Sequence, residues 1–397
     1  MTFNAPIYAD YQATTPVDPR VLNQMLPFWG GSFGNPHSND HVVGWRAAEA
    51  VRESQISVSR LIGADTDEIV FTSGATEANN LALFGLARGA SPSRRRILVS
   101  AIEHKCVLAA VGALEEREGF NVEVVPVDSE GFIDLSALED KLDDSVLLAS
   151  IMAVNNEVGT IQDLPEIAGL LARHGVVFHC DAAQAPCAMD TAHLAECADL
   201  ISLSGHKIYG PQGIGALYIR RELHSSIEPM IYGGGQQNGL RSGTVPVPLC
   251  VGMAAAAEII RVEGADERLQ IACQRDLFMG LLLDSGFQVA VNGPTGGRRH
   301  PGNANLRFGG FAAQEILGSV QPRLAASSGA ACASGIPEPS HVLRALGLGE
   351  READSSVRFS FGRFSTNRDV REAATLVVNA LESLVQGGVA PVPAVEG

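Results

Sequence analysis

The chain has 397 residues, 46% hydrophobic and 19% charged, a composition typical of a folded protein long enough for two domains. Its formal net charge of −16 argues against non-specific binding to nucleic acid or anionic lipid, which requires clustered basic side chains. No apolar run approaches the ~20 residues that cross a bilayer, and the N-terminus lacks a basic region followed by an apolar one, so we expect a cytoplasmic protein without a membrane partner.

Apolar, β-rich runs alternate with amphipathic helical segments between about residues 41 and 260. Strands are expected at 68–74, 95–102, 121–128, 146–154, 176–183, 198–205 and 215–220. Helices are expected at 75–87, 107–118 and 164–175, the last closed by Gly175 as a C-cap. Several strands are apolar almost throughout, as in a sheet covered on both faces. The pattern predicts an α/β fold with a mainly parallel, doubly wound sheet.

The pattern changes after residue 263. Helices are expected at 266–286, 312–317 and 339–348 and in a final stretch through 382–386, with strands at 287–291, 303–308 and 357–364. We interpret this part as a smaller α+β domain. The predicted division is a large domain at 16–262, a small domain at 1–15 and 263–386, and a disordered tail at 387–397.

The counts of lysine and cysteine limit the kinds of site and reaction that the chain can support. The seven cysteines are odd in number and form no CxxC motif, so neither a disulfide framework nor a metal site is expected. Lysine occurs only at positions 105, 141 and 207. Any reaction that needs a lysine amine therefore has three candidates, and Lys141 lies in the charged EDKLDD stretch expected at the surface.

Three predicted strands end in polar residues, where open α/β sheets bind ligands. After the first, Ala75 and Thr76 open a helix whose free N–H groups favour a phosphate, although a simple helix start after a tight turn explains them equally well. The other two ends carry Asp181 and Gln184, and Ser204, His206 and Lys207. Taken alone, Asp181 and Lys207 are more simply explained as a salt bridge.

Pyridoxal phosphate accounts for these groups together. The cofactor needs a lysine for its Schiff base, a carboxylate facing its ring nitrogen and a phosphate cradle. Lys207, Asp181 and the turn at Ala75 and Thr76 supply them. Lys105, directly after His104 at another strand end, remains a competing anchor.

With these residues in place, the sequence resembles the cysteine desulfurases of the class V aminotransferase family, in its NifS/IscS-like group. The resemblance covers about residues 8 to 380. Its motifs are YADYQATTPVDPRV, FGNPHS, EIVFTSGATEANN, EHK, VNNEVG, DAAQ, SGHKIYGPQGIG, RSGT, SSGAACAS, EPSHVLRALGL and VRFSFGRF. It implies the fold type I of pyridoxal-phosphate enzymes, and conversion of L-cysteine to L-alanine with the sulfur left on an enzyme cysteine.

The resemblance also implies a role for each matched residue. Lys207 would anchor the cofactor and move the substrate α-proton, His104 would stack on the ring and transfer protons, and Cys332 would accept the sulfur. The cofactor-binding residues would be Ala75, Thr76, His104, Asn155, Asp181, Gln184, Ser204, His206 and Lys207, with Thr244 from the second subunit of a homodimer. Asn155 and Arg358 would bind the substrate carboxylate.

Alternatives remain at this level. Taken alone, Arg358 suits the outward face of a strand, Asn155 a turn and His104 a buried structural position. A transaminase, a kynureninase-like hydrolase and a selenocysteine lyase share the cofactor site but do not need Cys332. A non-catalytic sulfur-relay scaffold would lack the lysine, the aspartate or the cysteine, and all three are present. The sulfur-acceptor protein, whether it serves an iron–sulfur cluster, a thionucleoside or another thiolated product, is not identified by the sequence.

Overall fold

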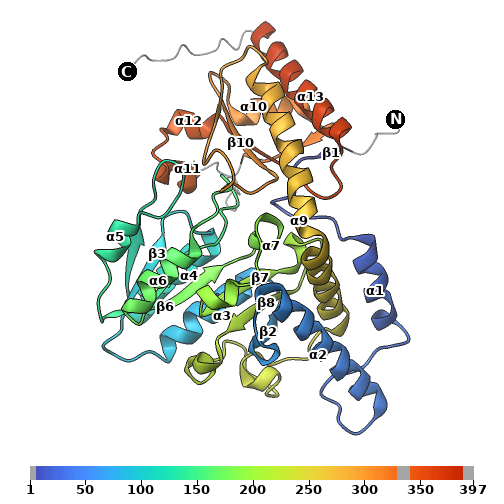
Figure 1. Ribbon diagram of the computed structural model, residues 1–397, viewed down its shortest axis with the longest axis vertical. Helices are drawn as coiled ribbons and strands as arrows, with labels where there is room; N and C mark the ends of the chain where they lie inside the picture. The colour runs from blue at the N-terminus through green and yellow to red at the C-terminus, as the bar shows by residue number, and fades with distance from the viewer. Residues whose placement is uncertain (1–5, 329–339, 388–397) are drawn as a thin grey trace.

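The computed structural model describes residues 6–328 and 340–387 and contains a seven-stranded sheet at its centre (Figure 1). The strand order is β2-β8-β7-β6-β5-β3-β4. The strands are β2 (Ile69–Thr72), β3 (Arg96–Ser100), β4 (Asn121–Val125), β5 (Val146–Ser150), β6 (Val177–Asp181), β7 (Leu200–Ser204) and β8 (Gly215–Ile219). Only β8 runs antiparallel to its neighbours. The predicted mainly parallel sheet is confirmed.

Helices cover both faces of this sheet. Alternate strand residues pack with α3 (Ala75–Arg88) and α4 (Lys105–Glu118) on one face, as in the cluster that contains Val70 and Val99. The other face packs against α2 (Val42–Ile62), α6 (Leu164–Arg173) and the first part of α9 (Val247–Leu283). Shorter helices and turns are α1 (Pro19–Trp29), α5 (Leu135–Glu139), α7 (Ala185–Ala188), α8 (Leu194–Cys197), η1 (Thr66–Glu68), η2 (Gly205–Lys207), η3 (Arg221–Ser226) and η4 (Gln237–Gly239).

A three-stranded antiparallel sheet forms a second layer at the top of Figure 1, with strand order β12-β10-β9. Its hydrophobic cluster joins the strands to α10, α13 and the last part of α9. The elements are β9 (Val289–Val291), β10 (Asn303–Phe308), α10 (Ala313–Val320), α11 (His341–Ala345), α12 (Glu350–Asp354), β12 (Ser356–Ser360) and α13 (Asn367–Gln386). Strands β1 (Ile7–Tyr8) and β11 (Leu324–Ala325) pair in parallel nearby.

Helix α9 connects the two regions. It begins at Val247, well before the helix at 266–286 that the sequence predicts, and runs for 37 residues without a break. Its early residues, such as Met253, belong to the cluster of the large sheet, and Phe278 belongs to that of the small sheet. The boundary that we propose between residues 262 and 263 therefore falls inside a continuous helix, and the proposed tail beyond Gly387 lies outside the described residues.

Local signals explain most helix starts. Asp18 accepts a hydrogen bond from Arg20 N and precedes Pro19 at the first position of α1, and Thr366 and Asp369 form a capping box at the start of α13. At the end of α6, His174 is the cap residue, and the predicted Gly175 follows it with φ +59. None of the described helices is long and apolar enough to cross a membrane.

Candidate active site

A cavity of about 460 Å³ opens at the carboxyl ends of the central strands, beside the start of α3. Polar loops meet here because parallel strands end at the same edge of the sheet. The cavity brings together eight of the predicted site residues: Ala75, Thr76, His104, Asp181, Gln184, Ser204, His206 and Lys207. It is also lined by Cys106 and Asn156, which the sequence analysis did not select.

Lys207 lies in η2, directly after β7, with its amine inside the site. Its Nζ donates hydrogen bonds to the carbonyl oxygens of Gln12 at 2.6 Å and Ala13 at 2.7 Å. Burial, and then the positive charge of Arg358, lowers the pKa of this amine to about 8. A substantial fraction of the amine is therefore neutral near physiological pH, as a nucleophile or base requires. Of the other lysines, Lys105 is exposed at the start of α4.

Asp181 is buried at the end of β6. It does not form the salt bridge with Lys207 that the two residues, taken alone, would suggest. Its Oδ2 accepts a hydrogen bond from Asn79 Nδ2 at 2.7 Å, and Oδ1 accepts one from Ala183 N at 3.0 Å. No ion pair joins it to Lys207 within the described part of the chain, so the salt-bridge reading is wrong. The carboxylate is thus held in place while facing the cavity.

Asn79 and Cys106 link Asp181 to His104 through a chain of hydrogen bonds. Asn79 Nδ2 donates to the sulfur of Cys106 at 3.2 Å, and that sulfur lies 3.0 Å from His104 Nδ1. The backbone N–H of Cys106 also donates to Nδ1, because His104 is the N-cap of α4. Burial, followed by the field of Asp181, raises the pKa of the Cys106 thiol to about 11, so its sulfur carries its proton at neutral pH.

These contacts determine which ring nitrogen of His104 carries the proton. Its Nδ1 accepts the Cys106 N–H bond, so in the neutral ring the proton is on Nε2. Burial is the main cause that lowers the pKa of His104, and the charges of Lys207, His341 and Lys105 act in the same direction while Asp181 opposes them. The ring is therefore mostly neutral at pH 7 and suited to exchange a proton.

The end of the cavity at α3 suits a phosphate. Gly74, at the N-cap position, has no side chain to occupy the first N–H groups of this 14-residue helix, and Thr76 lies in its first turn. Ser204 and His206 line the same cavity, and His206 Nδ1 lies 3.0 Å from Thr14 Oγ1. Burial, followed by the charge of Lys207, lowers the pKa of His206 to about 4.

The structure corrects the prediction for Asn155. Its side chain is fully buried, donating to Ile102 O at 3.0 Å and accepting from the N–H groups of Glu157 and Val158 at 2.8 and 2.9 Å. It shapes the VNNEVG turn and does not line the cavity, whereas the adjacent Asn156 does. The sequence offered two neighbouring asparagines, and only the backbone path determines which one faces the site.

Arg358, on β12, extends from the small sheet to the edge of the cavity. Its Nη1 donates to Asn156 O at 2.9 Å, and its Nη2 pairs with Asp10 at 2.6 Å. Its Nε has no hydrogen-bond partner among the described residues, although the side chain is only 5% exposed. A buried guanidinium with an unused N–H group beside the cavity is suited to a carboxylate ligand.

Comparison with known proteins identifies the family. Residues 7–372 match the model of the aminotransferase class-V family. The chain belongs to the class V aminotransferase family. It is 45% identical over 385 residues to a protein named cysteine desulfurase IscS in Rickettsia felis, covering 96% of this chain and 92% of that protein. A relative of the same name in Rickettsia prowazekii is also 45% identical, over 380 residues.

Solved structures agree with this family assignment. A protein titled NifS-like protein superimposes with a TM-score of 0.89 at 33% identity, covering 96% of this chain and all of that one. A structure titled SspA in complex with cysteine gives a TM-score of 0.80 at 36% identity, covering 90% of this chain and 99% of that one. The expected fold, that of the class V aminotransferases of fold type I, is confirmed, as is the resemblance to cysteine desulfurases.

Asn155 and Arg358 are not among the residues that line this cavity, and two further predicted site residues, Thr244 and Cys332, are not placed in it by the structure. Thr244 is exposed and does not line it, so its role in a second subunit stays a prediction. Cys332 lies outside the described residues. The residues that flank its segment are described: Ser327 forms two backbone hydrogen bonds with Arg358, at 3.1 and 2.7 Å, and Ser340 Oγ donates to Glu157 at 2.5 Å. The described residues on either side of segment 329–339 therefore contact Arg358 and Glu157.

The contribution of the N-terminal segment to the site is not predictable from the sequence. The carbonyl of Gln12 accepts hydrogen bonds from both Lys207 and Gln184, and its side-chain oxygen accepts one from Asn303 Nδ2 at 2.6 Å. The YADYQATTP motif contributes to the family resemblance. The groups that act here are backbone carbonyls, which every residue has, so the residue types do not reveal them. This contribution becomes visible only in the structure.

Proposed function

We propose that this protein is a pyridoxal-phosphate-dependent cysteine desulfurase that converts L-cysteine to L-alanine and leaves the sulfur as a persulfide on Cys332. The observation that carries the proposal is one cavity containing a partly neutral lysine amine, a buried carboxylate and an open helix N-terminus. Membership of the class V aminotransferase family and the likeness to proteins named cysteine desulfurase support the same reaction.

The residues fit the cofactor. A cavity of about 460 Å³ lies within the range of small-molecule sites. Lys207 would hold the aldehyde carbon through its Nζ, Asp181 would face the ring nitrogen, and His104 would lie against the ring. Gln184 would lie near the phenolic oxygen, and the phosphate would be held by Ala75, Thr76, Ser204 and His206. When bound, pyridoxal phosphate supplies an electron sink that acidifies the substrate α-carbon and makes the substrate sulfur electrophilic.

The side chains of the protein then have distinct tasks. Arg358 would bind the substrate carboxylate through Nε and Nη2, replacing Asp10 on that edge, and we assign the accompanying amide contact to Asn156 in place of Asn155. Lys207 would remove the α-proton at its Nζ, because its lowered pKa makes the amine available as a base. His104 would exchange a proton at Nε2.

Cys332 would complete the reaction by attacking the substrate sulfur. The substrate C–S bond breaks, an S–S bond forms, and the released carbon takes the electron pair and a proton to become the methyl group of alanine. The thiol proton and the substrate protons balance this exchange, so no external oxidant or reductant is required. The enzyme persulfide would then pass its sulfur to an acceptor protein. We further propose that the enzyme acts in the cytoplasm as a homodimer in which Thr244 completes the phosphate site of the second subunit.

Replacing Lys207 tests the cofactor assignment. The Lys207→Ala variant should lose the visible absorbance of lysine-bound pyridoxal phosphate and all alanine production from cysteine. Lys141→Ala is the matched control, because this lysine pairs with Glu123 of β4, does not line the cavity and should leave both signals unchanged. Retention of absorbance and activity in Lys207→Ala would move the anchor elsewhere and remove the basis of the proposal.

Replacing Cys332 separates desulfuration from the other reactions of the family. Cys332→Ser should keep the bound cofactor and its spectral response to cysteine, but form no protein persulfide detectable by mass spectrometry. Cys273→Ser, at an exposed cysteine on α9, is the control. If protein persulfide still forms in Cys332→Ser, another cysteine accepts the sulfur, and if alanine is released without protein persulfide, a lyase reaction that does not use this thiol is the better description.

A further inference from the structure

The backbone that follows Lys207 adopts an unusual conformation. Tyr209, two residues later, has φ +64 although it is bulky and not glycine. Such a residue in the left-handed region is uncommon, and it persists only where the surroundings impose it. Because Tyr209 and Lys207 belong to the same short turn, whatever holds Tyr209 also determines how Lys207 leaves β7.

Tyr209 is held by the N-terminal segment and by the loop after β12. Its N–H donates to Thr15 Oγ1 at 2.8 Å, and its carbonyl accepts from Asp18 N at 3.0 Å. Its hydroxyl accepts the backbone N–H of Arg363 at 2.7 Å. All of its polar groups are therefore fixed by residues distant in sequence, as expected where tertiary contacts maintain a strained backbone.

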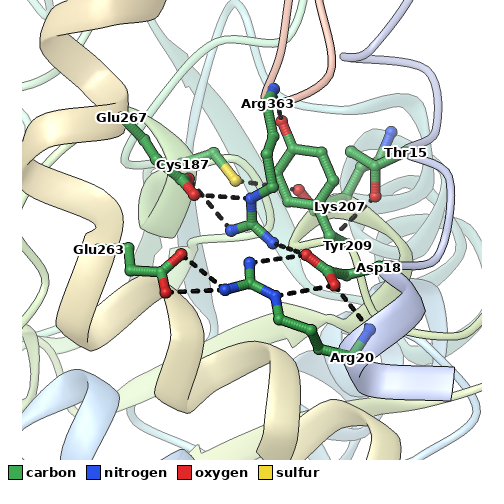
Figure 2. Close-up of polar contacts among 9 residues, drawn as sticks. All are labelled: Thr15, Asp18, Arg20, Cys187, Lys207, Tyr209, Glu263, Glu267 and Arg363. Atoms are coloured by element: carbon green, nitrogen blue, oxygen red, sulfur yellow. Dashed lines mark hydrogen bonds and ion pairs between the residues drawn. The ribbon is translucent and has the colours of Figure 1, made fainter. Parts of the chain in front are cut away.

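Arg363 also contacts Tyr209 with its side chain. The guanidinium lies over the Tyr209 ring, 4.1 Å from its centroid. It is 7% exposed and pairs with Asp18 at 2.7 Å on one side and with Glu267 of α9 at 2.7 Å on the other (Figure 2). Such a planar cation, held between two carboxylates, presses its face against the ring and leaves the ring little freedom to turn.

The same contacts extend to Lys207 itself. Cys187 donates its thiol hydrogen to the carbonyl of Lys207 at 3.3 Å, and Thr15 Oγ1 donates to the carbonyl of His206 at 3.0 Å. Figure 2 shows Arg363, Tyr209 and Asp18 meeting beside the Lys207 backbone. The turn that carries the lysine is thus fixed on several sides, and Arg363 is its link to the small sheet and to α9.

We propose that Arg363 is a positioning residue that acts through Tyr209 to fix the turn carrying Lys207, and so directs the lysine amine toward the cofactor. This role rests on the proposed function, because it concerns how Lys207 meets pyridoxal phosphate. It assigns no contact between Arg363 and the cofactor or the substrate. It gives the second arginine of the VRFSFGRF motif a task separate from that of Arg358.

The structure offers a matched pair of arginines to test this role. Arg363 and Arg20 both pair with Asp18, and each also pairs with a glutamate of α9, but only Arg363 contacts Tyr209. Full-length Arg363→Gln and Arg20→Gln would be purified with pyridoxal phosphate and compared by visible circular dichroism, which reports the geometry of the bound cofactor. Arg363→Gln should lose most of the dichroic band and bind pyridoxal phosphate at least about tenfold more weakly, whereas Arg20→Gln should match the parent protein.

Two further variants keep the test independent of folding. Arg363→Lys retains the charge but not the planar face, and we expect it to reproduce the spectral loss with a smaller change in Tm. Tyr209→Phe removes only the hydroxyl that accepts a hydrogen bond from the backbone N–H of Arg363. If Arg363 acts through Tyr209, the dichroic and binding effects of the double variant Arg363→Lys/Tyr209→Phe should be smaller than the sum of the single effects.

Three other results would each overturn a different part of the argument for Arg363. If the Arg363 variants lower Tm but keep the dichroic band and pyridoxal-phosphate affinity of Arg20→Gln, Arg363 is merely structural and the inference is overturned. Additive effects in the double variant would overturn the route through Tyr209. Absence of pyridoxal phosphate from the parent protein would instead overturn the proposed function, so the two failures are distinguishable.

Discussion

At the scale of single residues, the site depends on groups that hold the reactive side chains in place and set their protonation. The chain from Asp181 through Asn79 and Cys106 to His104 joins the end of β6 to the starts of α3 and α4. Glu103 lies fully buried beside it, and burial, followed by the charge of Asp181, raises the pKa of this carboxyl well above its usual range. The raised pKa of Glu103 favours its neutral form, which limits the negative charge beside Asp181.

Cys106 should influence the titration of His104. Cys106→Ala removes a thiol that stabilises the neutral ring through Nδ1, so the pKa of His104 should rise toward its ordinary value of about 6.5. The acidic limb of the activity profile should then move to higher pH, while Cys106→Ser should stay close to the parent because a hydroxyl can make the same bond. Activity measured from pH 5 to 9 for the three proteins checks this, and identical profiles for Cys106→Ala and the parent would contradict it.

The two adjacent asparagines should respond differently to substitution. Asn156→Ala should raise KM for cysteine several-fold with little change in stability, because its side chain lines the cavity. Asn155→Ala should instead lower the free energy of unfolding by about 2–4 kcal/mol, because it leaves buried backbone groups without partners. Urea unfolding and steady-state kinetics separate the two effects, and a substrate defect confined to Asn155→Ala would restore the original assignment.

At the scale of elements, α9 determines how the two sheets are joined. It contributes to both hydrophobic clusters and carries Glu263 and Glu267, which pair with Arg20 and Arg363. Its first part lies close to α1, where Gly252 faces Met25. The sequence around 247–262 is rich in alanine and has little helical amphipathicity, because this part is buried on several sides.

Two glycines of α9 provide a stability test within one helix. A Cβ at Gly280 meets no atom within 4 Å, so Gly280→Ala should raise the free energy of unfolding by about 0.5–1 kcal/mol through helix propensity. A Cβ at Gly252 would lie 2.5 Å from Met25 Sδ and 2.9 Å from Pro211 Cδ, so Gly252→Ala should lower it by about 1–3 kcal/mol. Chemical denaturation measures both, and a stabilising Gly252→Ala would refute the close packing of α1 on α9.

At the scale of the whole molecule, buried charges hold the N-terminal segment between the two sheets. Asp18 is 2% exposed and pairs with both Arg20 and Arg363, so it links α1 to the loop after β12. Hydrogen bonds from Arg20, and then from Arg363, hold the pKa of Asp18 well below its usual range. A carboxyl whose pKa is lowered by folding stabilises the folded state above its unfolded pKa of about 4, and this stabilisation is lost as pH falls.

Asp18→Asn should therefore show a pH-dependent stability defect. At pH 7 its free energy of unfolding should be lower than that of the parent by about 3 kcal/mol, because the buried Arg363 and the exposed Arg20 lose their shared anionic partner. The difference should stay nearly constant from pH 7 to 5 and shrink below pH 4, where Asp18 takes up a proton in the unfolded parent while it stays charged in the folded parent. Urea unfolding from pH 7 to 3 measures this difference, and a constant defect throughout would show that Asp18 acts through its shape alone.

The sequence by itself determined most of the side chains that meet in the cavity. Period and apolar content predicted most of the strands and the change from an α/β region to a smaller α+β region, because burial on both faces leaves a direct mark on residue type. The scarcity of lysine and the polar residues at strand ends pointed to Lys207, Asp181 and Thr76, the family resemblance added His104, and the cavity contains all four. These features are local, since each depends on a side chain and its immediate neighbours in the chain.

Only the tertiary structure decided which neighbour faces the site and what holds it there. It placed Asn156 in the cavity in place of Asn155, gave Asp181 an amide partner in place of Lys207, and brought Cys106 against His104. It also brought Arg363 onto Tyr209 from more than a hundred residues away. Such contacts depend on the paths of distant backbone segments and on carbonyl groups common to every residue, and neither leaves a pattern along the chain.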